Sequence, residues 1–187
     1  MKKLLALLAA GLLISFGAAQ PTIDGAVAEG EYANSVTEEE SGAMISWTVD
    51  GDMVYMAIQA ESEGWYGVGF APEIDNRKAG FDQYIFTLVD GAPMAYDMYQ
   101  DRARGTPVMD EEEGGTNNIA EFAASHDGAA WVIELVRPLD TGEATDAVIT
   151  PGSEMVLAIA HGETMDIERD HPRSSRGGAY YIEGVVF

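Results

Sequence analysis

The stretch ISWTVDGDMVYMAIQA, residues 45–60, contains two runs of strand-forming residues on either side of Gly51-Asp52. Each run is rich in β-branched, aromatic and other apolar residues, which suit a half-buried pleated surface. The Asp50-Gly51 pair, where the first run ends, is a strong signal for a tight turn. The stretch therefore predicts an antiparallel β-hairpin, and with it an all-β fold.

Further runs of the same kind follow, with Asp90-Gly91 as a second turn signal. In residues 130–139 Trp131, Ile133 and Leu135 alternate with their neighbours, so one side of this strand is expected to be buried. The sequence contains no convincing amphipathic helix, internal repeat or low-complexity linker. Strands at this spacing predict one antiparallel, immunoglobulin-like β-sandwich. The other predicted strands are 65–71, 82–89, 94–99, 155–161 and 179–187.

The first 19 residues have the layout of a secretory signal peptide: two lysines, an apolar run and small residues before Gln20. The apolar run is shorter than the ~20 residues of a membrane-spanning helix, so we expect cleavage rather than anchoring. Residues 20–187 are then expected to form the single domain, with no membrane span in the mature chain. The protein is predicted to be secreted or periplasmic.

The formal net charge of the chain is −22 at pH 7. Such a surface repels nucleic acid and anionic lipid, and it would complement a basic docking surface on a partner protein. The chain has no cysteine, which excludes disulfides, thiolate metal sites and thioether-linked cofactors. Any metal or cofactor must therefore be held by His, Met, Lys, Tyr or carboxylate side chains.

Two acidic runs, 38–40 and 110–113, invite a calcium interpretation. The only related motif, DGD at 50–52, lacks the rest of an EF-hand loop. Each run is therefore expected to form a solvated face or turn. The chain also lacks metalloprotease, serine-hydrolase and phosphate-loop signatures, so we do not expect an enzyme.

Several segments, taken together and in order, resemble the DOMON family, which is named after the N-terminal region of dopamine β-monooxygenase. The resemblance implies a β-sandwich that binds haem or a sugar-like or catechol-like ligand. In the haem-binding branch, a Met and a His hold a non-covalent b-type haem. The segments are TIDGAVAEGEY (22–32), ISWTVDGDMVYMAIQAESEGWYGVGFAP (45–72), KAGFD (78–82), MYQDRARGTPVMDEEEGGTNNI (98–119), VRPLDTGEATDAVITPG (136–152) and AIAHGETMDIERDHPRSSRGG (158–178).

By this resemblance the axial histidine falls on His171, and the methionine position falls on Lys78. Lys78 is the only lysine after the first three residues, and a lysine can give up its proton and use its nitrogen lone pair, whereas arginine cannot. Lysine also ligates haem b in a related family, the gamma subunits of ethylbenzene-type dehydrogenases. Met94, Met98 and His161 are the alternative ligands.

The resemblance also implies a haem pocket around these ligands. Three arginines lie close to His171 in sequence and would suit the two haem propionates: Arg169, Arg173 and Arg176. Five aromatic residues flank the segment that carries Lys78 and are candidate walls: Trp65, Tyr66, Phe70, Phe81 and Tyr84. Asp82, the family's Asp, either contacts the haem or holds a turn. His126 is expected at the surface.

Two protein ligands would fill both axial positions, which favours electron transfer with a redox partner over catalysis. We therefore expect an exported protein that carries one non-covalent haem b. Two alternatives remain: a module that binds a sugar or another small ligand without haem, and a carrier of haem or metal. A copper carrier would use methionines such as Met53, Met56, Met94, Met98 and Met109.

Overall fold

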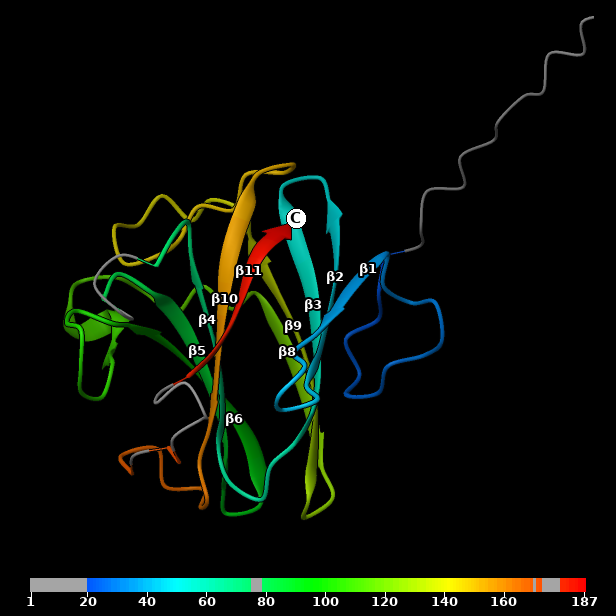
Figure 1. Ribbon diagram of the computed structural model, residues 1–187, viewed down its shortest axis with the longest axis vertical. Coiled ribbons are helices and arrows are strands. Elements are labelled where there is room, and N and C mark those ends of the chain that lie inside the picture. The colour runs from blue at the N-terminus through cyan, green and yellow to red at the C-terminus, as the bar shows by residue number, and fades with distance from the viewer. Residues whose placement is uncertain (1–19, 75–78, 170, 173–178) are drawn as a thin grey trace, which may run out of the picture.

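The computed structural model describes residues 20–74, 79–169, 171–172 and 179–187, which form two antiparallel β-sheets packed face to face (Figure 1). One sheet has the order β1 (Asn34–Thr37), β2 (Met44–Asp50), β3 (Met53–Glu61), β9 (Ala130–Pro138), β8 (Glu121–His126). The other has the order β11 (Tyr180–Val186), β10 (Glu154–His161), β4 (Tyr66–Ala71), β5 (Asp82–Val89), β6 (Ala92–Tyr99), β7 (Val108–Met109). A short 3-10 helix, η1 (Asp110–Glu112), follows β7.

The predicted turns are formed by the residues that signalled them. Asp90 and Gly91 join β5 to β6 with φ angles of 52° and 81°. A type I′ turn needs a positive φ angle at both central residues, which Asp and Gly tolerate. The opening hairpin pairs β2 with β3 from Met44↔Gln59 to Asp50↔Met53. The predicted antiparallel β-sandwich is confirmed.

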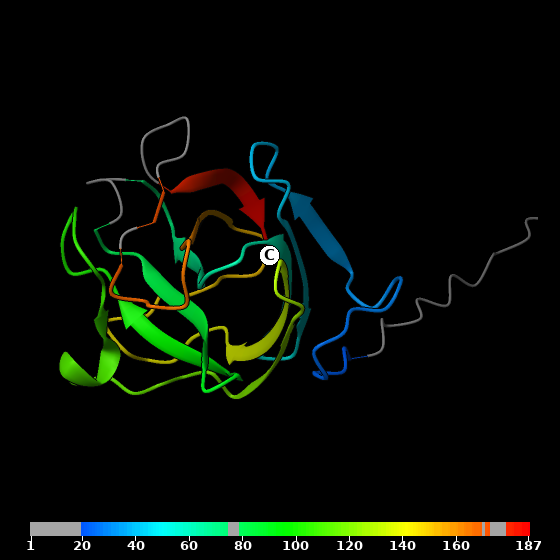
Figure 2. The same ribbon diagram turned by 90° about the horizontal axis from the view of Figure 1, so that it is seen from below.

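The hydrophobic core lies between the two sheets, which Figure 2 shows end-on. Alternate residues of each strand point inward, as the pleat requires. Burying a large apolar side chain contributes roughly 1.5–3 kcal/mol, so this layer supplies most of the driving force for folding. Among the described residues, no helix is long and apolar enough to span a membrane. The core includes Trp47, Met56, Ile58, Phe86, Trp131, Ile133, Leu135 and Leu157.

The acidic runs do form turns, but their first carboxylates are not solvated. Glu38 is 6% exposed and accepts hydrogen bonds from the Glu40 and Ser41 amides. Asp110 is fully buried at the start of η1. Both runs therefore form turns as expected, and Glu38 and Asp110 are their buried members.

Candidate functional site

A hollow of about 710 Å³ lies on the outer face of the six-stranded sheet, and we call it the outer pocket. Its floor consists of small residues, because the outward positions of β4 and β10 that line it are Gly or Ala. Gly67 and Gly69 come from β4, and Ala158 and Ala160 come from β10. Ligand-binding clefts usually have volumes of about 300–1,000 Å³, so this one is large enough for a small molecule or cofactor.

The walls of the outer pocket come from residues that are far apart in sequence. Trp65 precedes β4, and Ile85 is the pairing partner of Gly67 on β5. The 103–107 loop also contributes lining residues, and so do Ile167, Arg169 and His171. In Figure 1 the segment after β10, coloured orange, lies outside the six-stranded sheet. The pocket is therefore bounded by the sheet on one side and by loops on the others.

His171 lies at the wall of the outer pocket beside Trp65. The two ring centroids are 6.4 Å apart, with the rings nearly perpendicular. The His171 Nδ1 atom lies 2.9 Å from the carbonyl oxygen of Pro172. A carbonyl only accepts, so Nδ1 carries the proton, and the Nε2 atom of the neutral ring keeps its lone pair. Trp65 Nε1 is buried without a hydrogen-bond partner among the described residues.

Two arginines contribute to the pocket lining, Arg104 and Arg169. Arg169 is largely exposed and lies 3.5 Å from Asp166 in an ion pair. Three of the residues singled out in the sequence lie outside the described residues: Lys78, Arg173 and Arg176.

The aromatic candidates divide between the two faces of the sheet. Trp65 lines the outer pocket, and Phe81 is buried on the same face against Tyr181, beside the pocket. The other three candidates belong to the core between the sheets instead: Tyr66, Phe70 and Tyr84. The alternation of β4 explains this division, because Tyr66 and Phe70 occupy positions of opposite parity to Gly67 and Gly69.

The alternative ligands are also dispersed. Met98 is buried on the outer face with Trp65 and Ile85, whereas Met94 is 41% exposed on the same strand. His161 stacks between Tyr66 and Tyr180, with rings tilted by only 8° and 7°. Burial lowers the pKa of His161, so its neutral form is favoured.

The methionines considered for copper do not gather at one place. Met56 is in the core, whereas Met98 is on the outer face of the other sheet. His126 is half-buried rather than free at the surface. Its Nε2 atom lies 2.9 Å from the Ser62 carbonyl oxygen, and its ring contacts Trp131.

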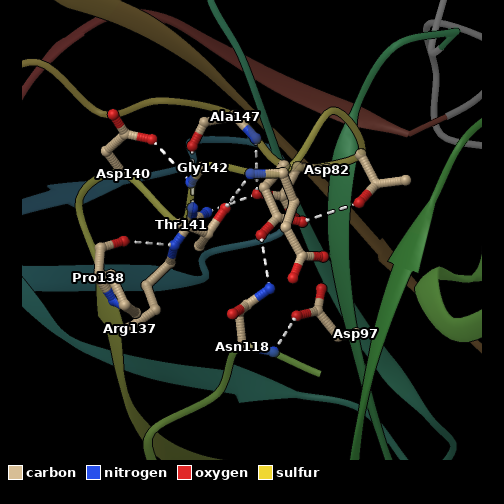
Figure 3. A network of polar contacts seen from close by, with 12 residues as sticks. Asp82, Asp97, Asn118, Arg137, Pro138, Asp140, Thr141, Gly142 and Ala147 are labelled. Atoms are coloured by element: carbon tan, nitrogen blue, oxygen red, sulfur yellow. Dashed lines mark hydrogen bonds and ion pairs between the residues drawn. The ribbon is translucent and has the colours of Figure 1, made fainter. Parts of the chain in front are cut away.

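Asp82 points between the sheets and forms a buried ion pair with Arg137 of β9 (Figure 3). The same carboxylate oxygen accepts a hydrogen bond of 3.0 Å from the Ala147 amide. Burial raises the pKa of Asp82 to about 6, although Arg137 and the amide act in the opposite direction. Asp82 thus joins β5 to β9 and to the loop after β9, and it is not among the lining residues of the outer pocket.

The sequence interpretation did not single out the floor of the pocket or the 103–107 loop. A signal for the floor exists in the runs YGVGFA (66–71) and LAIA (157–160), where every second residue is Gly or Ala. Large inward residues alternate with small outward ones, which predicts one packed face and one face open to a ligand. No comparable signal marks Arg104 as a lining residue.

Comparison with known proteins gives one family and a set of similar folds. Residues 39–162 match the DOMON domain. The cytochrome b domain of pyranose dehydrogenase from Coprinopsis cinerea is similar in structure, with a TM-score of 0.52, 13% identity and 80% of each chain covered. The cytochrome domain of Myriococcum thermophilum cellobiose dehydrogenase has a TM-score of 0.50 and 9% identity, covering 82% of this chain and 81% of that one. No curated protein sequence matches the chain.

Proposed function

Since the chain belongs to the DOMON family, we propose that it binds one b-type haem non-covalently in the outer pocket and transfers electrons to or from a redox partner. The observation that carries the proposal is the position of His171 at the wall of a pocket whose floor is made of Gly and Ala. The names of two proteins with this fold, both cytochrome domains of dehydrogenases, support it.

The residues of the outer pocket fit a flat, largely apolar cofactor. Gly67 leaves the sheet surface open where a side chain would otherwise stand, and Gly69 allows Phe81 and Gln83 to pack closely against the backbone of β4. Trp65 and Ile85 supply apolar walls. His171 supplies a nitrogen ligand, because the Pro172 carbonyl holds the proton on Nδ1 and leaves Nε2 free to bind iron. A haem held in this way would supply a one-electron redox centre.

The arginines of the pocket match the two acidic groups of haem. Arg104 and Arg169 are lining residues in a chain of net charge −22. Guanidinium groups form strong paired hydrogen bonds with carboxylates, so these two side chains would orient the propionates. We propose the same role for Arg173 and Arg176, which lie outside the described residues.

We propose Lys78 as the second axial ligand on the strength of the family resemblance. With His171 and Lys78 both on the iron, no coordination position would be open to oxygen or substrate, which favours electron transfer over catalysis. The acidic surface would suit a redox partner with a basic docking face. Export through the signal peptide of residues 1–19 is part of the same proposal.

The decisive experiment compares haem retention in the parent protein with that of His171→Ala. The parent, expressed with adequate haem, is expected to show a b-type spectrum, and acid-acetone should extract the pigment because the chain has no cysteine. His171→Ala is expected to lose the pigment. His126→Ala is a stringent control, because it removes a hydrogen bond and the contact with Trp131 but should keep the haem.

Two results would contradict the proposal. If His171→Ala and His126→Ala both bind haem like the parent, His171 is not a ligand. If the folded parent is colourless and takes up no added haemin, the outer pocket serves another small ligand, such as the sugar-like ligands of the family.

A further inference from the structure

Carboxylates from four segments meet at one end of the space between the sheets. One oxygen each of Asp82, Asp97 and Asp146 lies within 4.8 Å of the other two, and the same holds for one oxygen each of Asp110, Glu143 and Asp146. The two groups share Asp146 and therefore form one carboxylate cluster. Its residues come from β5, β6, η1 and the loop after β9. Figure 3 shows the Asp82 and Asp97 side with its hydrogen bonds.

The negative charge of the cluster is only partly compensated. Arg137 is fully buried and pairs with Asp82, and its other N–H groups donate to the carbonyls of Pro138 and Ala147. No basic side chain within the described ranges forms an ion pair with Asp97, Asp110 or Asp146. Burying carboxylates without a compensating cation is strongly unfavourable, so this arrangement calls for a further positive charge.

Buried oxygens of the cluster also lack hydrogen-bond donors. The Asn118 amide donates to Asp97 Oδ2 at 2.8 Å, and the Ala147 amide holds one oxygen of Asp82. Asp82 Oδ1 and Asp97 Oδ1 have no partner among the described residues, and the Asp110 carboxylate has only the Thr145 hydroxyl and the Asp146 carboxyl group beside it. Asp82, Asp97 and Asp110 are each at most 1% exposed. Buried acceptors are nearly always satisfied, so their convergence at one point indicates a ligand.

The chain also builds a frame around the cluster. Thr116 donates to Glu143 through both its amide and its hydroxyl, each at 2.8 Å. A Cβ atom at Gly115 would lie 2.6 Å from Glu143 Oε2 and 3.0 Å from Thr145 Oγ1, so a side chain there would displace the Glu143 carboxylate. Asn118 Nδ2 holds Asp146 at 3.0 Å. These contacts orient the Glu143 and Asp146 carboxylates, as outer-shell partners do at metal sites.

We propose that the carboxylate cluster binds one divalent cation of the calcium class. Every candidate donor is an oxygen, which suits hard cations and not the nitrogen- and sulfur-preferring ions such as zinc or copper. Calcium binds oxygens at about 2.3–2.6 Å, so oxygens on opposite sides of it are about 5 Å apart, in agreement with the spacing here. Magnesium, with bonds of about 2.0–2.1 Å, would need a tighter cluster.

Protons are the competing occupants. Burial raises the pKa of Asp97 to about 8 and that of Asp110 to about 7. The cation would join η1 and the loop after β9 to the paired strands β5 and β6. Since Asp110 follows the 103–107 loop closely, the cation would also hold the C-terminal end of one wall of the outer pocket.

The test uses the haem-free full chain after treatment with a chelator, so its result does not depend on the proposed function. Isothermal titration with calcium chloride at physiological ionic strength is expected to give one bound ion per chain. The thermal unfolding midpoint should rise with calcium and rise less with magnesium at the same concentration. Asp97→Asn and Asp110→Asn keep the side-chain shape and remove the charge, and each should weaken binding at least about tenfold. Asp52→Asn, at an exposed turn, should bind like the parent.

Two outcomes would overturn the proposal. The absence of stoichiometric binding by the folded parent at millimolar calcium would mean that protons neutralise the cluster. Binding of equal strength in the parent, Asp97→Asn and Asp110→Asn, with circular dichroism showing folded protein, would mean that calcium gathers on the acidic surface. The measurement on the parent keeps the test decisive even if a variant does not fold.

Discussion

Replacing Gly67 with valine separates the stability of the sheet from the capacity of the outer pocket. A Cβ atom at this position would lie 3.4 Å from a ring carbon of Trp65 and 3.7 Å from both Ile85 Cγ1 and the Ala160 carbonyl oxygen. These are ordinary contact distances, so the sheet accepts the first carbon without strain. The two further methyl groups of valine have only the pocket to enter.

The two expected effects have opposite signs. A glycine inside a strand is less favourable than alanine by about 0.5–1 kcal/mol, and a β-branched residue suits a strand better still. The haem-free Gly67→Val protein should therefore be as stable as the parent or slightly more stable. Overpacking a fitted site costs about 1–3 kcal/mol, which corresponds to a roughly 5- to 150-fold loss of haem affinity. Gly67→Ala should lie between the parent and Gly67→Val.

Haem titration followed by absorbance measures the affinity, and thermal unfolding of the haem-free proteins measures stability. Ala123→Val is the control, since it enlarges a half-buried residue of β8 on the other sheet. Its haem affinity should equal that of the parent. If Gly67→Val folds and binds haem as tightly as the parent, the ligand does not lie on this face of the six-stranded sheet. If the haem-free variant is markedly less stable, the space above Gly67 is not open.

Three further predictions concern single side chains. Arg137→Met should lower the free energy of unfolding by about 3–5 kcal/mol and the melting temperature by roughly 6–20 °C, because Asp82 loses its buried partner. Adding Asp82→Asn to this variant should restore part of the lost stability, whereas calorimetry that finds no change in Arg137→Met would contradict the buried ion pair. Burial lowers the pKa of His161 from 6.5, so the stability of the haem-free protein should fall as pH decreases from about 6.5 toward the folded-state pKa. Denaturant titrations of His161→Phe, which keeps the stack on Tyr66 and Tyr180, should not show this pH dependence of stability. Lys78→Met should raise the midpoint potential of the haem and abolish an acid transition in its spectrum, because a thioether replaces an amine for which protons compete. Identical potentials and acid titrations in the parent and the variant would mean that Lys78 is not a haem ligand.

The sequence predicts the sandwich well because its signals are local. The Asp90-Gly91 turn and the run before Gly51 contain all the residues that decide their conformations. The strands β1 and β8 were not predicted, since NSVT and EFAASH are short and weakly apolar. They are strands because β2 and β9 present free edges with which they pair, which is a tertiary effect.

The site is less predictable, because contacts between segments that are far apart in sequence decide which side chains meet there. Tyr66, Phe70 and Tyr84 are close in sequence to the segment that carries Lys78. The alternation of side chains along β4 and β5 nevertheless directs them into the core between the sheets. The burial of Asp110 depends on contacts with loops more than thirty residues away in sequence, including Asp146, which no local pattern reveals. Asp82 was one of the candidates, and its partner Arg137 lies on the other sheet.

The alternation of large and small residues in β4 also bears on the accuracy of folding. Glycine-containing strands are prone to pair in the wrong register, because they offer few side chains to distinguish one alignment from another. A shift of β4 by one residue would turn Tyr66, Val68 and Phe70 out toward solvent and place Gly67 and Gly69 opposite the other sheet. The misaligned chain would lose three core side chains and leave voids in their place, each at a substantial cost in stability. The residues that leave room for a ligand therefore also help to ensure that β4 has only one favourable alignment, whether or not the ligand is bound.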